Sequence, residues 1–300
     1  MGFMSVKRPE TADWVPFILP WNDSSPTVID ASGLLDGPAG RHGFLQARDG
    51  HFFFEDGTRA RFWGVSVTFG ACFPTHGEAE AVAGRLAKFG FNLVRFHHMD
   101  GRRRPDGILD PDYADTQHLD PAQLERLDYF IYQLKGRGIY ADLNLLVSRN
   151  FTEADNVTDA RDLPRLCKFV TLFDDRLIEL QKDYAGKLLT HYNNYTGARY
   201  VDEPAVALIE TANENSLFRG WLNDNLNGKR GNIYDIPGHY SDILDERWNR
   251  WLRKRYGDRA SLDSAWSASE GGGVDGLLPD EDPALNSVRR ILHSEAEGFT

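Results

Sequence analysis

The chain has 300 residues, which is enough for one large domain or two of ordinary size. Hydrophobic residues make up 41% of it and charged residues 26%, as in ordinary soluble globular proteins. The net charge of −11 argues against nucleic acid or an anionic membrane as a partner, and it suits a neutral ligand.

Targeting signals and cysteine usage add two expectations. Residues 1–10 contain no apolar run of signal-peptide length, and no segment is long enough to span a membrane. We therefore expect the chain as it stands in the cytoplasm, or outside the cell if a leader has been removed.

The separation of Cys72 and Cys167 matches no metal motif. We expect two free thiols, with a single disulfide as the alternative.

Residues 1–60 form a first segment that is irregular at its start and rich in β-structure at its end. Residues 51–54 and 59–63, both rich in aromatic residues, lie on either side of Asp56-Gly57, a dipeptide typical of tight hairpin turns. We expect this hairpin to pack on the second segment, residues 61–300.

From residue 61 the chain alternates strands and helices. Nearly continuous apolar runs predict four buried strands, over residues 62–67, 92–96, 139–147 and 205–211. Such runs are covered on both faces of a sheet, so the strands should be parallel.

Three helices are predicted between these strands. The first begins at Thr75, three residues before Glu78, which is the spacing of a capping box, and it ends near Gly90. The second begins at Asp120-Pro121, because proline is favoured in the first turn of a helix. The third has one apolar face, formed by Leu177, Leu180, Tyr184 and Leu188.

Strands and helices in this series fit either a (β/α)8 barrel or a doubly wound sheet. A doubly wound sheet usually has a glycine-rich turn after its first strand, and residues 67–71 lack that pattern. The long loops after the strands also fit a barrel, where such loops build the active site. We therefore predict an α/β fold, the (β/α)8 TIM barrel, of which this chain supplies about the first half.

The chain changes character after residue 214. A charged stretch with regularly spaced apolar residues predicts a helix, and the flexible run 270–273 follows it. The apolar residues of this stretch are Trp248, Leu252, Tyr256 and Trp266. We find no fifth buried strand before Thr300, so this part is interpreted as a long excursion after the fourth strand.

The pair Asn213-Glu214 follows the fourth predicted strand. A carboxylate placed there can protonate a departing glycosidic oxygen, and the amide beside it can hydrogen-bond a sugar hydroxyl. The alternative is an ordinary surface turn. If the strand stays regular, the side chains of Glu210 and Glu214 point to the same face of the sheet. We expect Glu210 to make internal hydrogen bonds.

Further polar residues end the other strands. Arg95 is costly to bury alone, so we expect it to pair with a carboxylate, in a site or as a structural ion pair. His97 and His98 could be metal ligands, but adjacent side chains on an extended chain point apart. We therefore expect no metal site, and we expect both histidines and Asn144 to contact sugar hydroxyls. Trp221, after the fourth strand, is expected to stack on a sugar ring.

These motifs resemble those of a known group. Residues 92–95 and 210–214 are similar to segments of the clan-A retaining glycoside hydrolases. These enzymes are (β/α)8 barrels that include the cellulase family and the thermophilic-type β-galactosidases. Residues 248–257 and 265–266 resemble the helix after strand four in the β-galactosidase branch. The resemblance covers roughly residues 50–270.

The resemblance implies a role for each matching residue. Glu214 matches the general acid/base, Asn213 the residue that holds the sugar 2-hydroxyl, and Arg95 the arginine that supports the nucleophile. The nucleophile of the family is a second glutamate at the end of strand seven, which we expect beyond the end of this chain. The resemblance thus implies the N-terminal portion of a glycosidase that cleaves β-linked neutral sugars by a retaining mechanism, without a cofactor.

Two other functions fit the same residues. One is a catalytically silent carbohydrate-binding barrel, and the other is an unrelated barrel enzyme, such as a metal-dependent one. Turnover of a glycoside would distinguish the glycosidase from the first alternative, and metal analysis would identify the second. The sequence does not determine the oligomeric state.

Overall fold

The computed structural model describes residues 20–267 and 276–296. Its main sheet has four parallel strands, β3 (Gly64–Thr68), β4 (Leu93–His97), β5 (Tyr140–Asn144) and β8 (Val206–Glu210). The four strands predicted from the sequence, and their parallel direction, are confirmed.

The order of the strands decides between the two candidate architectures. A doubly wound sheet reverses its strand order at a switch point. Here the order is β3-β4-β5-β8, so each strand lies beside the one before it. The intervening β6 (Tyr192–Asn193) and β7 (Ala198–Arg199) form a separate antiparallel ribbon. The fold is therefore α/β, and this sheet has the topology of half a (β/α)8 barrel.

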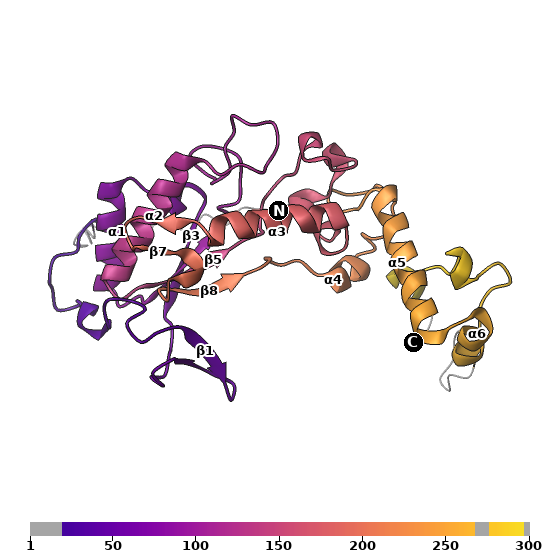
Figure 1. Cartoon of the computed structure of the whole chain (residues 1–300), viewed down its shortest axis with the longest axis horizontal. Helices are drawn as coiled ribbons and strands as arrows, with labels where there is room; N and C mark the ends of the chain where they lie inside the picture. Colours follow the sequence, from indigo (N-terminus) through magenta and orange to yellow (C-terminus); the bar gives the residue numbers. More distant parts are fainter. Residues whose placement is uncertain (1–19, 268–275, 297–300) are drawn as a thin grey trace, which may run out of the picture.

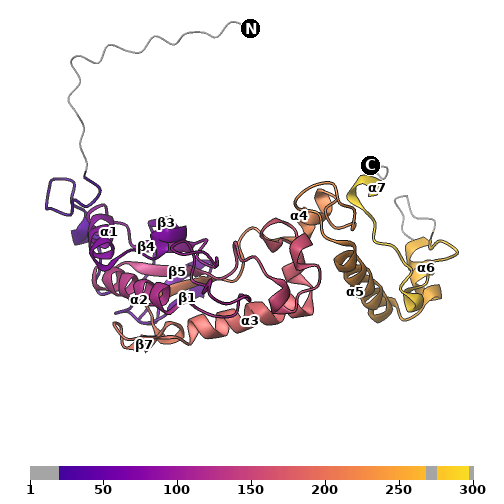
Figure 2. The same cartoon turned by 90° about the horizontal axis from the view of Figure 1, so that it is seen from above.

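Helices α1 (His76–Lys88), α2 (Pro121–Gly136) and α3 (Asp175–Leu189) cover one face of this sheet (Figures 1 and 2). Alternate strand residues, such as Val94 and Phe96 of β4, are buried against these helices. The same core includes Ala83, Leu127, Phe130, Leu143, Tyr184 and Leu188. The remaining strand residues point to the opposite face, which corresponds to the inside of a barrel.

The predicted helix starts are confirmed. The backbone N–H and the hydroxyl of Thr75 donate to Glu78 at 2.9 and 2.7 Å, within the capping box of α1. At the start of α2, the carboxylate of Asp120 accepts from the backbone N–H groups of residues 122 and 123. These local signals allowed both helices to be placed from the sequence.

The predicted reversal at Asp56-Gly57 is present, and a second hairpin precedes it. Across the predicted turn, residues 52–54 pair with residues 58–60 through two backbone hydrogen bonds and one antiparallel bridge, a shorter pairing than predicted. The longer regular ladder joins β1 (Leu45–Arg48) to β2 (His51–Phe54) and was not predicted. Both residues of its turn, Asp49-Gly50, have positive φ, 52° and 75°, which matches the twist of a two-residue hairpin.

The β1–β2 hairpin packs against the N-terminal ends of the sheet strands. The ring of Phe54 stacks on that of Tyr140, with centroids 5.2 Å apart, and both belong to a cluster with Leu93 and Ala205. These three partners lie at the N-terminal ends of the strands or just before them. The hairpin therefore covers the end of the half-barrel opposite the predicted site.

After β8 the chain leaves the sheet. Helices α4 (Leu217–Leu222), α5 (Gly238–Tyr256), α6 (Arg259–Ser267) and α7 (His293–Ala296) follow, and α5 and α6 extend away from the barrel strands (Figure 1). They have a small core of their own, formed by Leu252, Leu262, Leu277 and Val288. The predicted helical stretch is confirmed, and the run 270–273 lies outside the described residues.

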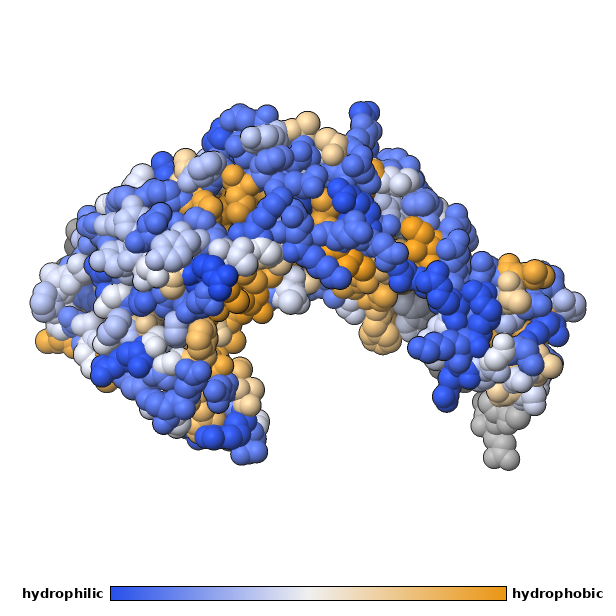
Figure 3. Space-filling view, in the orientation of Figure 1, coloured by the Kyte–Doolittle hydropathy of each residue, from blue (hydrophilic) through white to orange (hydrophobic). Residues whose placement is uncertain are grey.

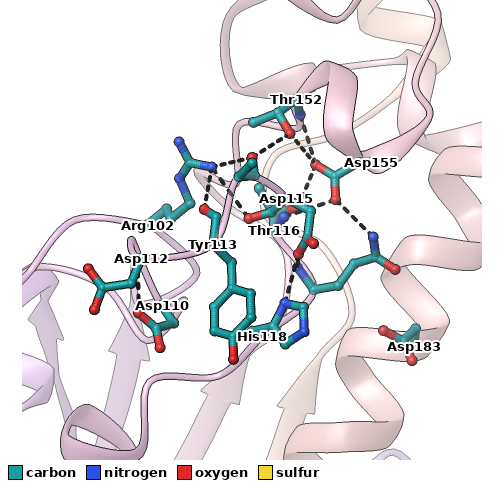
Figure 4. A network of polar contacts seen from close by, with 12 residues as sticks. Arg102, Asp110, Asp112, Tyr113, Asp115, Thr116, His118, Thr152, Asp155 and Asp183 are labelled. Atoms are coloured by element: carbon teal, nitrogen blue, oxygen red, sulfur yellow. Dashed lines mark hydrogen bonds and ion pairs between the residues drawn. The ribbon is translucent and has the colours of Figure 1, made fainter.

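The long loops after β4 and β5 are bonded to each other (Figure 4). Asp155 accepts from the backbone N–H and the hydroxyl of Thr116 at 2.9 and 3.0 Å, and also from Thr152. Asp100, buried directly after β4, accepts from the backbone N–H groups of residues 147–149. These bonds fix the two loops at the C-terminal ends of the strands, where barrels build their sites.

Short 3₁₀ turns complete the connections, at Ser32–Leu34, Phe69–Cys72, Glu153–Asp155, Ala160–Asp162, Arg165–Cys167, Val170–Leu172, Tyr200–Asp202 and Pro283–Leu285. Cys72 and Cys167 are buried free thiols, as predicted.

The molecule is arched, and hydrophobic residues gather along its hollow side (Figure 3). In the part of the chain that the structure describes, no helix is both long and apolar enough to cross a membrane.

Candidate active site

Polar residues occupy the inner face of the sheet near the C-terminal ends of the strands. The register places Arg95 of β4 beside Asp142 of β5, and Asn144 beside Glu210 of β8. An irregularity of the β5–β8 pairing next to Asp142 produces this alignment. Residues from three strands therefore converge at one end of the half-barrel.

Arg95 is the centre of this group. Its Nε and Nη2 donate to the two carboxylate oxygens of Glu210, each at 2.6 Å, and Nη2 also donates to Oδ1 of Asn213 at 3.1 Å. The amide nitrogen of Asn144 donates to the same carboxylate. The predicted pairing of Arg95 with a carboxylate is confirmed, and so are the internal hydrogen bonds of Glu210. The structure also brings Asn213 and Asn144 into the group.

The two carboxyl groups of the inner face have opposite electrostatic surroundings. The hydrogen bonds from Arg95, followed by its positive charge, lower the pKa of Glu210. Burial, followed by the negative charge of Glu210, raises the pKa of Asp142 to about 7. Sequence reasoning did not single out Asp142. The available signal was a carboxylate inside a buried apolar run.

His97 and His98 contact each other, so the expectation that they point apart was wrong. His98 has a φ of 54°, which breaks the extended alternation and brings the ring centroids to 4.2 Å. The ring of His98 also stacks on Phe69 at 4.6 Å. Burial is the main cause that lowers the pKa of each histidine. Within residues 20–267 and 276–296, no group of three or more His, Cys, Asp or Glu residues could hold a metal ion.

Glu214 lies beyond this group, at a sharp change of chain direction. Its φ is 45°, so the strand is not regular here, and Glu210 and Glu214 do not point to the same face as expected. Glu210 faces Arg95, whereas Glu214 is exposed and lines a cavity of about 400 Å³ together with Lys168 and Arg219. Asn213 joins the two regions, because its side chain contacts Arg95 while its carbonyl faces Lys168.

Lys168 is a residue of this site that sequence reasoning missed. It lies in the loop between β5 and α3, is 8% exposed, and donates from Nζ to the carbonyl of Asn213 at 2.5 Å. Burial lowers the pKa of Lys168, and the charge of Glu214 opposes that effect. No sequence motif marks it, because a long irregular loop determines where it lies.

The structure places Trp221 against the C-terminal segment. Its indole N–H donates to the carbonyl of Ile291 at 2.8 Å, and its ring meets that of His293 edge to face. The sugar-stacking role of Trp221 stays a prediction. Trp63, another tryptophan, is 66% exposed and stacks on Phe91 before β3 begins. It therefore lies at the end of the sheet opposite Glu214.

No protein-family model matches the chain, and no curated protein matches it. Similar solved structures include the endo-1,4-β-mannanase from Rhizomucor miehei, with 16% identity, a TM-score of 0.49, and coverage of 71% of this chain and 58% of that one. The glycoside hydrolase family 5 mannosidase from the same organism has 14% identity, a TM-score of 0.48, and coverage of 75% and 59%.

The endo-β-1,4-mannanase from Thermotoga petrophila has 19% identity and a TM-score of 0.41, with coverage of 66% of this chain and 41% of that one. The chain therefore spans less than two thirds of the length of each of these enzymes.

Proposed function

We propose that the chain carries part of the active site of a retaining glycoside hydrolase that acts on β-linked sugars. The observation that carries this proposal is the hydrogen bond between Arg95 and Asn213, directly before the exposed carboxylate of Glu214. A proton donor, an amide and a cation held at the mouth of one barrel suit glycoside cleavage.

Glu214 is the general acid in the first step and the general base in the second. It first protonates the leaving glycosidic oxygen, and it then removes a proton from the water that releases the sugar. Its exposed position beside a cavity gives a substrate access to the carboxyl group.

Asn213 orients the sugar. Its Oδ1 accepts from Arg95, which leaves the amide N–H₂ group available to donate to a sugar hydroxyl. We assign this group to the 2-hydroxyl, where a hydrogen bond strengthens in the transition state. His97 and His98 lie at the end of β4, which β5 separates from β8, and they provide further polar contacts to the sugar.

A retaining mechanism also needs a carboxylate that attacks the anomeric carbon. The described inner-face carboxyl groups are poor candidates, because Glu210 is engaged by Arg95 and Asn144, and Asp142 is 5% exposed. We assign the nucleophile to a second glutamate on a strand that completes the barrel and lies outside residues 1–300. We assign the support of this nucleophile to Arg95, whose side chain lies on the inner face.

A turnover assay with stereochemical analysis tests this function. The protein that contains the barrel-closing strands is supplied with a panel of aryl β-glycosides and β-linked oligosaccharides, and the first anomer released is identified by NMR. Release of the β-anomer is expected. Release of the α-anomer would contradict the retaining mechanism. Binding of the sugars without turnover would favour the silent carbohydrate-binding barrel.

A further inference from the structure

The cavity beside Glu214 has an unusual charge for this protein. Lys168 and Arg219 both line it, and Glu214 is the one carboxylate among its described lining residues. The chain as a whole has eleven more acidic than basic residues. Carboxylates are therefore plentiful in the sequence, yet the cations of this cavity outnumber them.

Neither cation is neutralised by a close ion pair in the described residues. Lys168 uses one of its three N–H donors on a backbone carbonyl, that of Asn213. The exposed guanidinium of Arg219, on α4, has no side-chain hydrogen bond or salt bridge with any described residue. The charge of Arg219 contributes to lowering the pKa of Lys168, so the two cations disfavour each other. A bound anion would remove this repulsion.

The backbone holds Lys168 in place. The residues on either side of it have positive φ values, in the region that residues other than glycine rarely adopt. They are Leu166, Cys167 and Phe169, at 57°, 50° and 69°. Strain of this kind persists only where the surroundings impose it, and it is common at ligand sites. The buried cation is therefore fixed at the cavity wall.

The cavity also has a polar wall without further charge. Asn225 and Asn232 line it, and the amide nitrogen of each donates to Oδ1 of Asp235 at 2.7 Å. The carboxylate of Asp235 is fully engaged there, since it also accepts from two backbone N–H groups. The wall thus presents fixed dipoles and no second negative charge.

We propose that this cavity binds a carboxylate or sulfate group carried by the sugar chain, so that the substrate is an acidic glycan. The inference rests on the proposed function, because Glu214 defines where the scissile bond lies. Glu214 lines the cavity, and its neighbour Asn213 contacts Arg95 on the inner face. We therefore place the charged sugar next to the glycosidic bond that Glu214 protonates. Arg219 and Lys168 pair with its anionic group.

Binding to the protein that contains the barrel-closing strands tests the proposal, because the open sheet edges of the 300-residue chain alone are expected to cause association. The probes are three β-disaccharides joined by sulfur, so that they are not cleaved, and they differ only at one C6 position, which carries a hydroxyl, a carboxylate or a sulfate. Calorimetry should show about tenfold or tighter binding of at least one charged probe than of the neutral one, as expected for charge-assisted hydrogen bonds. The probe that binds tighter identifies the anionic group. Added salt should reduce only this preference.

Variants assign the preference to the cavity. Arg219→Gln should remove the preference for the charged probe, while Arg165→Gln, an exposed cation outside the cavity, should retain it. Lys168→Met, with thermal melting as a check of folding, should also remove it. Equal affinity for neutral and charged probes, or equal losses in Arg165→Gln and Arg219→Gln, would overturn the proposal.

This test separates the inference from the hydrolase proposal. If neutral glycosides are cleaved and no charged probe is preferred, the inference fails and the proposed function stands. If a charged probe is preferred through Arg219 but no glycoside is cleaved, the anion site stands and the hydrolase proposal fails.

Discussion

Asp142 and Glu210 are adjacent carboxyl groups with different protonation behaviour. Arg95 holds Glu210 in its ionised form through two hydrogen bonds, and this lowers the pKa of Glu210. Asp142 has no cation of its own, so burial and the neighbouring charge raise its pKa to about 7. A protonated Asp142 can lie beside an ionised Glu210 without repulsion, which stabilises the inner face below neutral pH.

The pH dependence of stability follows from the raised pKa of Asp142. In the unfolded chain this group ionises near its ordinary value of 3.8, whereas the folded protein retains the proton up to about pH 7. The folded state therefore loses stability, relative to the unfolded chain, as the pH rises from about 4 to about 7. The free energy of unfolding falls by up to about 1.4 kcal/mol per pH unit in this range. Asp142→Asn has no ionisable group at this position and should not show this fall.

Denaturant unfolding at several pH values measures this effect. The stability of Asp142→Asn relative to the wild type should increase between about pH 4 and pH 7 and stay constant above that range. Asp242→Asn, an exposed position on α5, controls for the loss of a surface carboxylate. A difference between Asp142→Asn and wild type that is independent of pH would show that Asp142 ionises normally.

Single residues were predictable where their chemistry leaves few options. A strand-end arginine needs a carboxylate, and Arg95 has one. Its partner was assigned only in general terms, because the β5–β8 register depends on an irregularity that no local pattern marks. Lys168 was not predictable, since its position depends on the folding of an irregular loop.

Among the secondary-structure elements, helix starts were predictable because their signals are local. Asp120 supplies both a cap for α2 and a partner for Arg104, and it is almost fully buried. Asp-Gly pairs occur at residues 49–50 and 56–57, and the chain reverses at both. Only the second turn was predicted, because residues 45–48 before the first pair have no pattern typical of a strand.

Substitution of Asp120 separates its two roles. Asp120→Ala should lower the free energy of unfolding by about 2 kcal/mol, because a buried cap and an ion-pair partner are both lost. Asp120→Asn retains the capping oxygen and should cost less than half as much. Chemical denaturation measures both changes. Equal losses in the two variants would mean that the pair with Arg104 dominates and the cap contributes little.

At the scale of the whole molecule, the net charge does not describe the local charge of the cavity. The value of −11 suggested a neutral ligand, which stays a prediction, and the cavity next to Glu214 has more cations than carboxylates. The barrel topology was predictable, since strands and helices alternate regularly and the long loops follow the strands. The direction in which the chain leaves the sheet after β8 was not, because no periodic pattern encodes it (Figure 1).

The described sheet has two edge strands. Neither β3 nor β8 pairs with a further strand in the described part of the chain, and Ile209 of β8 is 40% exposed. Open edges with apolar neighbours promote association. Residues 1–300 expressed alone should therefore associate, as measured by light scattering. Ile209→Lys should raise the monomer fraction, whereas Leu34→Lys, an exposed apolar position away from the sheet, should not. A wild-type chain that is monomeric would contradict this expectation.

The rate of glycoside cleavage by Glu214→Gln tests the central claim most directly. In the protein that contains the barrel-closing strands, this variant should lose on the order of 10²–10⁴-fold in turnover of sugars with poor leaving groups. The loss in the glycosylation step should be smaller for activated aryl glycosides, which need no protonation. Glu246→Gln, an exposed glutamate on α5, is the matched control and should retain full activity. Unchanged turnover of unactivated glycosides by Glu214→Gln would contradict the account.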